Sequence, residues 1–143
     1  MKIKPIVTDY IKTKHTSFEV DLKLDYNVTF ISGDSGIGKS ALYSFLQEYA
    51  AENKDVRCFN YLDQNRKVYK GSIKQSKGKL FVIDNADILL DDDMRRYIAF
   101  DDKNQYIIIG RNPTGLQLTV DEIFELQDTN VDGITLFRIK KSF

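Results

Sequence analysis

The chain has 143 residues, of which 42% are hydrophobic and 29% charged, and this predicts a single domain, 1–143, with a core large enough to fold alone. Its 21 Lys and Arg residues balance 21 Asp and Glu residues, which excludes a basic field over the whole surface of the kind that binds nucleic acid. One cysteine, Cys58, excludes an internal disulfide. The sequence shows neither a secretory leader nor a membrane-spanning apolar run, so we expect a cytoplasmic protein with no membrane contact.

The N-terminal part of the chain contains two short extended stretches, 2–10 and 17–26. In the second, apolar residues alternate with charged ones, as in a strand with one face in water. The alternating apolar residues are Phe18, Val20, Leu22 and Leu24. We expect the two stretches to form an antiparallel β add-on, 1–26, to a core that covers 27–143, and Pro5 favours an edge position for the first stretch.

Apolar strands and helices alternate through the remaining residues. Strands are predicted at 27–32, 56–62, 79–84 and 105–110, helices at about 39–53 and 91–100, and two last strands in EIFEL and GITLFRIK. The polar segment 63–79 is predicted to be a loop or a short hairpin. Because this order of elements needs crossover connections, we expect an α/β fold in three layers with a mainly parallel sheet.

A glycine-rich turn joins the strand at 27–32 to the first helix. Its sequence, Gly33-Asp-Ser-Gly-Ile-Gly-Lys-Ser40, has the spacing of a phosphate-binding loop (P-loop). Glycines let backbone N–H groups turn toward a phosphate, and the N-terminus of the following helix attracts an anion. We expect nucleotide binding through nine residues: Gly33, Asp34, Ser35, Gly36, Ile37, Gly38, Lys39, Ser40 and Ala41.

Two residues of this loop and one distant aspartate have the most specific predicted roles. Lys39 should reach the β- and γ-phosphates of a nucleoside triphosphate, and the Ser40 hydroxyl should ligate Mg²⁺. Asp84 follows four apolar residues in LFVID, at the carboxyl end of a predicted strand. A carboxylate at that place would hold the same metal ion through water, so Ser40 and Asp84 are the predicted metal residues.

The residues that follow Asp84 decide whether a bound nucleotide would be hydrolysed. In many ATPases with this arrangement the next residue is a glutamate that polarises the attacking water, whereas this chain has Asn85. An amide orients water but cannot take its proton. Asp87 would be a substitute base if the chain turns helical there. We therefore expect slow or partner-dependent hydrolysis, with Lys39, Asp84, Asn85, Asp87 and Arg111 as the catalytic candidates.

Arg111 follows the predicted strand at 105–110, in the sequence YIIIGRNPTG. Ligands of open α/β sheets bind beyond the carboxyl ends of the strands, so a guanidinium there is placed to sense or stabilise a γ-phosphate. A surface arginine in a turn set by Pro113 and Gly115 accounts for the same residues equally well. Arg95 and Arg96, on the helix at 91–100, are predicted to lie on a solvated face.

The layout resembles that of P-loop NTPases of the AAA+, ABC and STAND branch, in which an additional strand separates the P-loop strand from the strand with the Walker B acid. The resemblance covers about residues 17–112. It implies that Lys39 and Ser40 are the Walker A pair, Asp84 the Walker B acid and Arg111 a sensor on the additional strand. The chain departs from these families because it has no LSGGQ-like signature, no Walker B glutamate and no helical lid after the core.

A second resemblance points to a different class of reaction. The octapeptide GDSGIGKS is also similar to the P-loop of HPr kinase/phosphorylase, a protein-serine kinase. Where that family has paired acids on a nearby strand, VRCFNYLD supplies only Asp63. The basic segment 63–79 is open to three interpretations: a reduced kinase lid, a surface (66–79) that contacts nucleic acid or a protein partner, or a solvated loop, which its composition favours.

These residues together predict a Mg-ATP-binding P-loop ATPase-like module with weak intrinsic ATPase activity. ATP and Mg²⁺ are the expected cofactors, and a protein partner or self-association is expected because the module would be regulatory or part of a larger assembly. Two alternatives stay open. One is a phosphotransferase that passes the γ-phosphate of ATP to a protein or small-molecule acceptor, and the other is an interaction protein that binds nucleotide without catalysis.

Overall fold

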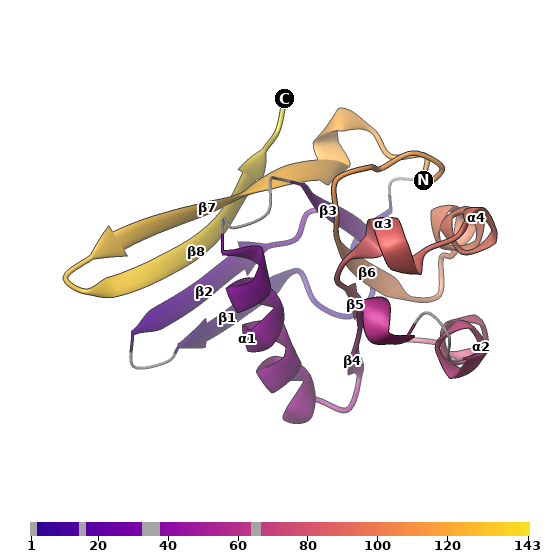
Figure 1. Ribbon diagram of the computed structural model, residues 1–143, viewed down its shortest axis with the longest axis horizontal. Coiled ribbons are helices and arrows are strands. Elements are labelled where there is room, and N and C mark those ends of the chain that lie inside the picture. Colours follow the sequence, from indigo (N-terminus) through magenta and orange to yellow (C-terminus); the bar gives the residue numbers. More distant parts are fainter. Residues whose placement is uncertain (1–2, 15–16, 33–37, 64–66) are drawn as a thin grey trace.

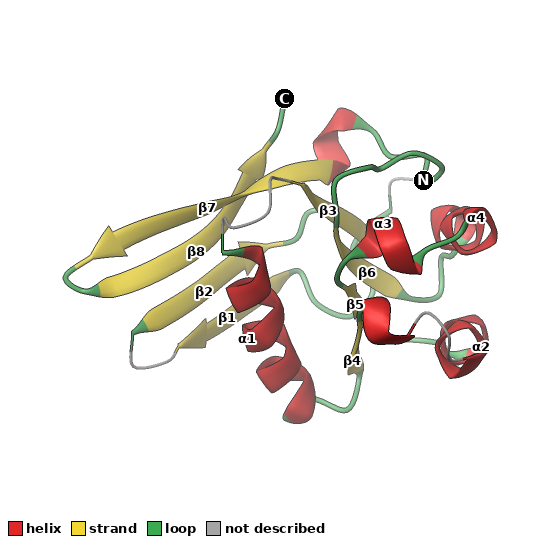
Figure 2. Cartoon of the chain, in the orientation of Figure 1, coloured by secondary structure: helices red, strands yellow, loops and turns green. Residues whose placement is uncertain are grey.

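The computed structural model describes residues 3–14, 17–32, 38–63 and 67–143. These residues form a mixed α/β fold, in which one sheet of eight strands carries four α-helices and two short 3₁₀ helices (Figures 1 and 2). The elements are β1 (Tyr10–Lys14), β2 (Phe18–Lys23), β3 (Val28–Ser32), α1 (Lys39–Ala51), β4 (Val56–Phe59), η1 (Tyr61–Asp63), α2 (Lys67–Gln75), β5 (Leu80–Ile83), α3 (Ala86–Leu89), α4 (Asp92–Phe100), β6 (Gln105–Ile109), η2 (Val120–Glu122), β7 (Ile123–Val131) and β8 (Ile134–Lys141).

The sheet is mixed, and its strands lie in the order β1-β2-β8-β7-β3-β6-β5-β4. The part from β7 to β4 is parallel throughout. An antiparallel pair does form near the N-terminus, between β1 and β2, although β1 lies after the predicted first stretch, and β7 and β8 form a second antiparallel pair. Strand β6 lies between β3 and β5, which places one strand between the element before the glycine-rich turn and the element before Asp84.

The C-terminal hairpin joins the N-terminal strands to the parallel part of the sheet. Strands β7 and β8 are connected by Asp132 and Gly133, whose φ angles of 53° and 81° are those of a type I′ turn. On its other side β8 pairs in parallel with β2, where Val20 faces Phe137 in register. Figure 1 shows the long β7–β8 hairpin extending away from α2, α3 and α4.

The strand predicted at 2–10 is wrong in position. Described residues 3–9 form no helix or strand, and β1 begins only at Tyr10. The side chain of Gln105 takes the place of a strand partner: its Oε1 accepts the Val7 and Thr8 backbone N–H groups at 2.8 and 3.0 Å, and its Nε2 donates to the Thr8 carbonyl at 2.8 Å. The segment is fixed to the sheet because a buried amide satisfies its backbone.

Two apolar clusters form the core, one on each face of the sheet. Figure 2 shows α1 on one side of the sheet and α2, α3 and α4 on the other. On one face α1 packs with Leu42 and Leu46 against residues such as Ile31. On the other, α2, α3 and α4 pack against residues such as Phe30 and Ile108. Neighbouring residues of β3 therefore face opposite clusters, as expected for a strand that is buried on both sides. Among the described residues, no helix is both long and apolar enough to cross a membrane.

The segment predicted to be a loop or hairpin, 63–79, contains a helix, so that prediction is wrong. Helix α2 covers Lys67–Gln75 and buries Tyr69 and Ile73, which are 2% and 0% exposed. These two residues lie four positions apart and so face the same side of the helix. Apart from Val68, the rest of the segment is polar or glycine, and an apolar stripe of two large side chains is too narrow to be recognised from periodicity alone.

The strand predicted at 56–62 is shorter in the structure. Strand β4 ends at Phe59, because the next residues turn into η1: the Asn60 N–H donates to Asp63 at 2.9 Å, and the Leu62 N–H donates to Asn60 at 2.9 Å. Cys58 of β4 is partly buried against the core of the α1 face. Burial raises the pKa of its thiol to about 12, as expected for a cysteine that packs against the core.

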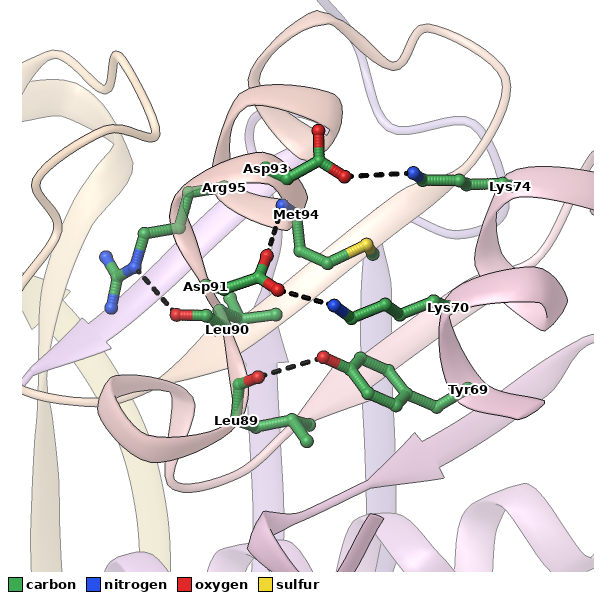
Figure 3. A network of polar contacts seen from close by, with 9 residues as sticks. All are labelled: Tyr69, Lys70, Lys74, Leu89, Leu90, Asp91, Asp93, Met94 and Arg95. Carbon is green, nitrogen blue, oxygen red and sulfur yellow. Dashed lines mark hydrogen bonds and ion pairs between the residues drawn. The ribbon is translucent and has the colours of Figure 1, made fainter. Parts of the chain in front are cut away.

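Polar contacts join α2 to the start of α4 (Figure 3). Lys70 pairs with Asp91, and Lys74 pairs with Asp93 at 3.1 Å. The Tyr69 hydroxyl donates to the Leu89 carbonyl at 2.9 Å. Two lysines of the basic segment thus lie against the acidic N-terminus of α4, where carboxylates are also favoured by the helix dipole.

Asp91 is the residue of this junction whose substitution should cost the most stability. It caps α4 and accepts from the Met94 N–H at 2.8 Å. We expect Asp91→Ala to lower the free energy of unfolding by about 1 kcal/mol at pH 7. The Lys70 hydrogen bond and the Met94 N–H hold the pKa of Asp91 below its usual value. A carboxyl whose pKa is lower in the folded protein stabilises it above its unfolded pKa, about 4, and loses that contribution as the pH falls through the lowered value.

Chemical denaturation of wild-type and Asp91→Ala proteins between pH 7 and pH 2 tests this prediction. The stability difference should shrink below about pH 4. Asp102→Ala removes an exposed aspartate that neither caps a helix nor pairs with another described residue, and it serves as the control. A difference that stays constant over the whole range would show that the charge of Asp91 does not contribute.

Candidate functional site

Helix α1 begins at Lys39, directly after Gly38. The glycine caps the helix with φ of +65°, and its carbonyl accepts from the Leu42 N–H at 2.9 Å. A Cβ atom at this position would meet the Phe137 ring at 2.7 Å. Both the positive φ and the close approach of β8 require glycine here. The predicted binding residues Gly33, Asp34, Ser35, Gly36 and Ile37 lie outside the described residues.

One cavity of about 120 Å³ brings together the functional residues predicted from three separate segments. They come from the start of α1, the end of β5 and the end of β6, and these elements meet at the carboxyl edge of the parallel strands. The lining residues are Lys39, Ser40, Asp84, Asn85, Asp87, Ile109, Gly110 and Arg111. Of the predicted binding residues that the structure describes, Gly38 and Ala41 do not line it, and Ala41 packs instead against the core.

Asp84 follows β5 and is half-buried at the edge of the cavity. Its backbone N–H donates to the Phe59 carbonyl at 2.9 Å, which continues the pairing of β5 with β4. Burial raises the pKa of the Asp84 carboxyl, while a hydrogen bond from the Asn85 backbone and the positive charge of Lys39 act in the opposite direction. The Lys39 ammonium therefore interacts electrostatically with this carboxylate across the cavity.

Asn85 adopts a left-handed backbone conformation, with φ of 51° and ψ of 47°. Its carbonyl accepts from the Ile88 and Leu89 N–H groups at 3.0 and 3.1 Å, so the residue starts α3, while its side chain is exposed and lines the cavity. Asparagine tolerates the left-handed conformation better than glutamate does. The turn between β5 and α3 therefore gives a backbone reason for an asparagine where the resemblance implied a glutamate.

The chain does turn helical at Asp87, which lies in α3 and lines the cavity. Both of its carboxylate oxygens already accept backbone hydrogen bonds. Oδ2 accepts from the Arg111 N–H at 2.8 Å and Oδ1 from the Asn112 N–H at 2.9 Å. These bonds make Asp87 a residue that holds the turn after β6.

Arg111 is exposed and lines the cavity from the turn that follows β6. Gly110, directly before it, packs closely against α3: a Cβ atom there would meet Asp87 Oδ1 at 3.2 Å and the Ala86 Cβ at 3.3 Å. The glycine thus lets the end of β6 approach the first residues of α3. Sequence reasoning did not single out Gly110 or Ile109 as lining residues, although both belong to the predicted strand at 105–110.

Arg95 does not lie on the predicted solvated face, so that part of the prediction is wrong. It is only 7% exposed. Its Nη1 donates to the carbonyls of Asn112 and Thr114 at 2.7 and 2.8 Å, and its Nη2 lies 3.7 Å from Asp87 Oδ1. The sequence carries no local signal for this burial, because the carbonyl partners lie in a turn far along the chain.

The donors for a magnesium ion would be the Ser40 hydroxyl and the Asp84 carboxylate, both of which line the cavity. The described residues include no group of three or more His, Cys, Asp or Glu side chains that would bind a metal by themselves. Magnesium bound with a nucleotide needs fewer protein ligands, because phosphate oxygens and waters complete its coordination. The two oxygen donors are suited to that kind of site.

The chain was compared with family models, with curated proteins and with solved structures, and none of them matches it.

Proposed function

We propose that the chain is a Mg-ATP-binding P-loop ATPase-like module, with a three-layer P-loop core and with slow or partner-dependent hydrolysis. The observation that carries this proposal is the convergence of Lys39, Ser40, Asp84 and Arg111 on one cavity. Their sources are the N-terminus of a helix and the carboxyl ends of two parallel strands, where phosphate groups bind in open α/β sheets. The position of β6 between β3 and β5 supports the additional-strand branch of these NTPases.

Each residue has a role that its position supports. Lys39 would contact the β- and γ-phosphates from the first turn of α1, and Ser40 and Asp84 would hold the magnesium ion. When bound, that ion would neutralise charge on the phosphates. Arg111 would contact the γ-phosphate from the turn that follows β6.

We expect slow hydrolysis because neither carboxylate that lines the cavity is available as a general base for the attacking water. Among the described lining residues the two carboxylates are Asp84 and Asp87. Asp84 is assigned to the metal ion, and the oxygens of Asp87 already accept two backbone N–H groups. Asn85 can orient a water molecule but cannot accept its proton. A partner that supplies the missing base would be consistent with a regulatory module or with a part of a larger assembly.

Nucleotide titration by calorimetry and thermal unfolding tests the binding proposal. We expect ATP with Mg²⁺ to stabilise the protein, ADP to stabilise it less, and chelation of Mg²⁺ with EDTA to weaken the effect of ATP. GTP in parallel reports base preference. If none of the nucleotides raises the unfolding temperature or releases heat on binding, the proposal is wrong.

Hydrolysis by the isolated protein should be slower than about one turnover per second, the lower end of typical enzyme turnover. Release of inorganic phosphate from γ-labelled ATP measures it. Tens of turnovers per second would contradict the roles assigned to Asn85 and Asp87. Label that appears on an acceptor, and not as free phosphate, would favour the phosphotransferase.

A further inference from the structure

A buried arginine, Arg95, holds the turn that carries Arg111. Arg95 Nη1 donates to the carbonyls of Asn112 and Thr114, and Arg95 Nε donates to the Leu90 carbonyl at 3.4 Å. Figure 3 shows the guanidinium leaving α4 on the side away from Lys70 and Lys74. The turn also packs on the arginine stem, since a Cβ atom at Gly115 would lie 3.5 Å from the Arg95 Cβ.

Asp87 holds the same turn by accepting hydrogen bonds from the N–H groups of the turn. It accepts the Arg111 and Asn112 N–H groups, and its Oδ1 lies 3.7 Å from Arg95 Nη2. The carboxylate therefore binds the turn's amides while the guanidinium binds its carbonyls. Asp87 and Arg95 also pair with each other. The residues that hold the turn are therefore connected to α3, the helix that begins two residues after Asp84.

We propose that Asp87 and Arg95 form a clamp that positions Arg111 for contact with the γ-phosphate of ATP. This proposal rests on the proposed function, because it assigns a nucleotide contact to Arg111. The two clamp residues act through the turn, so they are positioning residues, and Arg111 is the residue that meets the ligand. The clamp makes the site selective for a nucleoside triphosphate over a diphosphate.

The physical reason is the conformational freedom of the turn. The Arg111 side chain is exposed, so its backbone is the part that the protein can fix in advance. Without the clamp, the backbone of 111–114 would have to be ordered when ATP binds, and that loss of entropy would weaken the contact. ADP has no γ-phosphate, so its affinity should not depend on the clamp.

The first experiment measures the affinities for ATP and ADP, with Mg²⁺, in the full chain. Arg111→Ala sets the full size of the effect, and we expect it to lower the ATP-to-ADP affinity ratio about tenfold or more. Asp87→Ala should lower the ratio in the same direction with little change for ADP. In the double variant Asp87→Ala/Arg111→Ala the two losses should not add, because they remove the same contact.

Controls separate positioning from general loss of structure. Asp87→Asn keeps a carbonyl acceptor for one N–H group and should have an intermediate ratio. Asp92→Ala changes a nearby exposed aspartate of α4 and should leave the ratio unchanged. Arg95→Lys retains the charge but not the two-carbonyl contact, and it should lower the ratio even where Asp87→Ala fails to fold.

A second measurement needs no nucleotide. Amide hydrogen exchange at Arg111 and Asn112 should become about tenfold faster in Asp87→Ala, because each loses its acceptor, while exchange in β6 stays slow. Faster exchange with an unchanged ATP-to-ADP ratio would overturn the positioning role although nucleotide binding stands. Unchanged exchange at both amides would overturn the clamp itself. A wild-type protein that binds neither nucleotide would remove the proposed function and the role assigned to the clamp with it.

Discussion

Lys39→Ala should weaken the binding of Mg-ATP about 10- to 150-fold, the loss expected when a hydrogen bond from a charged group to phosphate is removed. Lys39 lies in the first turn of α1, lines the cavity and interacts electrostatically with Asp84. The effect should be visible as thermal stabilisation. At an ATP concentration 100 times the wild-type dissociation constant, ligand binding stabilises a protein by about 2.7 kcal/mol, and a 100-fold weaker variant by only about 0.4 kcal/mol.

Lys54→Ala is the matched control, since this exposed lysine lies beyond the opposite end of α1. It should bind Mg-ATP like the wild-type protein. Denaturation without nucleotide should show that Lys39→Ala remains folded. Full retention of ATP affinity in Lys39→Ala would mean that the cavity is not where the phosphates bind.

Gly38→Ala is expected to lower the free energy of unfolding by about 2–5 kcal/mol. About 1–2 kcal/mol would come from placing a Cβ atom at φ of +65°. A further 1–3 kcal/mol, roughly, would come from the contact of that atom with the Phe137 ring, at 2.7 Å. Urea denaturation measures the total.

Gly78→Ala separates the two contributions, because Gly78 has φ of +67° but no atom within 4 Å of an added Cβ. It should show the backbone cost alone. Gly38→Ala in a Phe137→Leu background should recover part of the contact cost, so the two substitutions should not be additive. Equal losses for Gly38→Ala and Gly78→Ala would show that β8 exerts no pressure on the start of α1.

The sequence predicted where α1 starts and that Asp84 and Arg111 follow the ends of strands. Each of these positions depends on a short-range pattern. A buried apolar strand fixes where its last residue lies, and parallel strands end at one edge of the sheet. Arg95 could not be predicted in this way. It stands in the charged run DDDMRRY, and what buries it is a pair of carbonyls contributed by residues 112 and 114.

The pairing between strands that are distant in the chain could not be predicted from the sequence either. The alternation in β2 correctly predicted that Val20 and Leu22 are buried, whereas Phe18 is 38% exposed. Nothing in the alternation indicates that β2 pairs with β8. The β7–β8 hairpin did carry a signal, since Asp-Gly at 132–133 between two apolar runs is typical of a two-residue turn. Helix α2 could not be predicted from local sequence, because it is stabilised by the packing of Tyr69 and Ile73 against the sheet.

The contact between Gly38 and Phe137 also bears on the order in which the molecule matures during synthesis. Gly38 leaves the ribosome long before Phe137, and N-terminal elements generally begin to fold first. Until β8 has emerged, β2 lacks one of its neighbours and the glycine before α1 lacks the ring that packs over it. The packing around the start of α1 is therefore complete only once β8, the last strand of the chain to be synthesised, has joined the sheet.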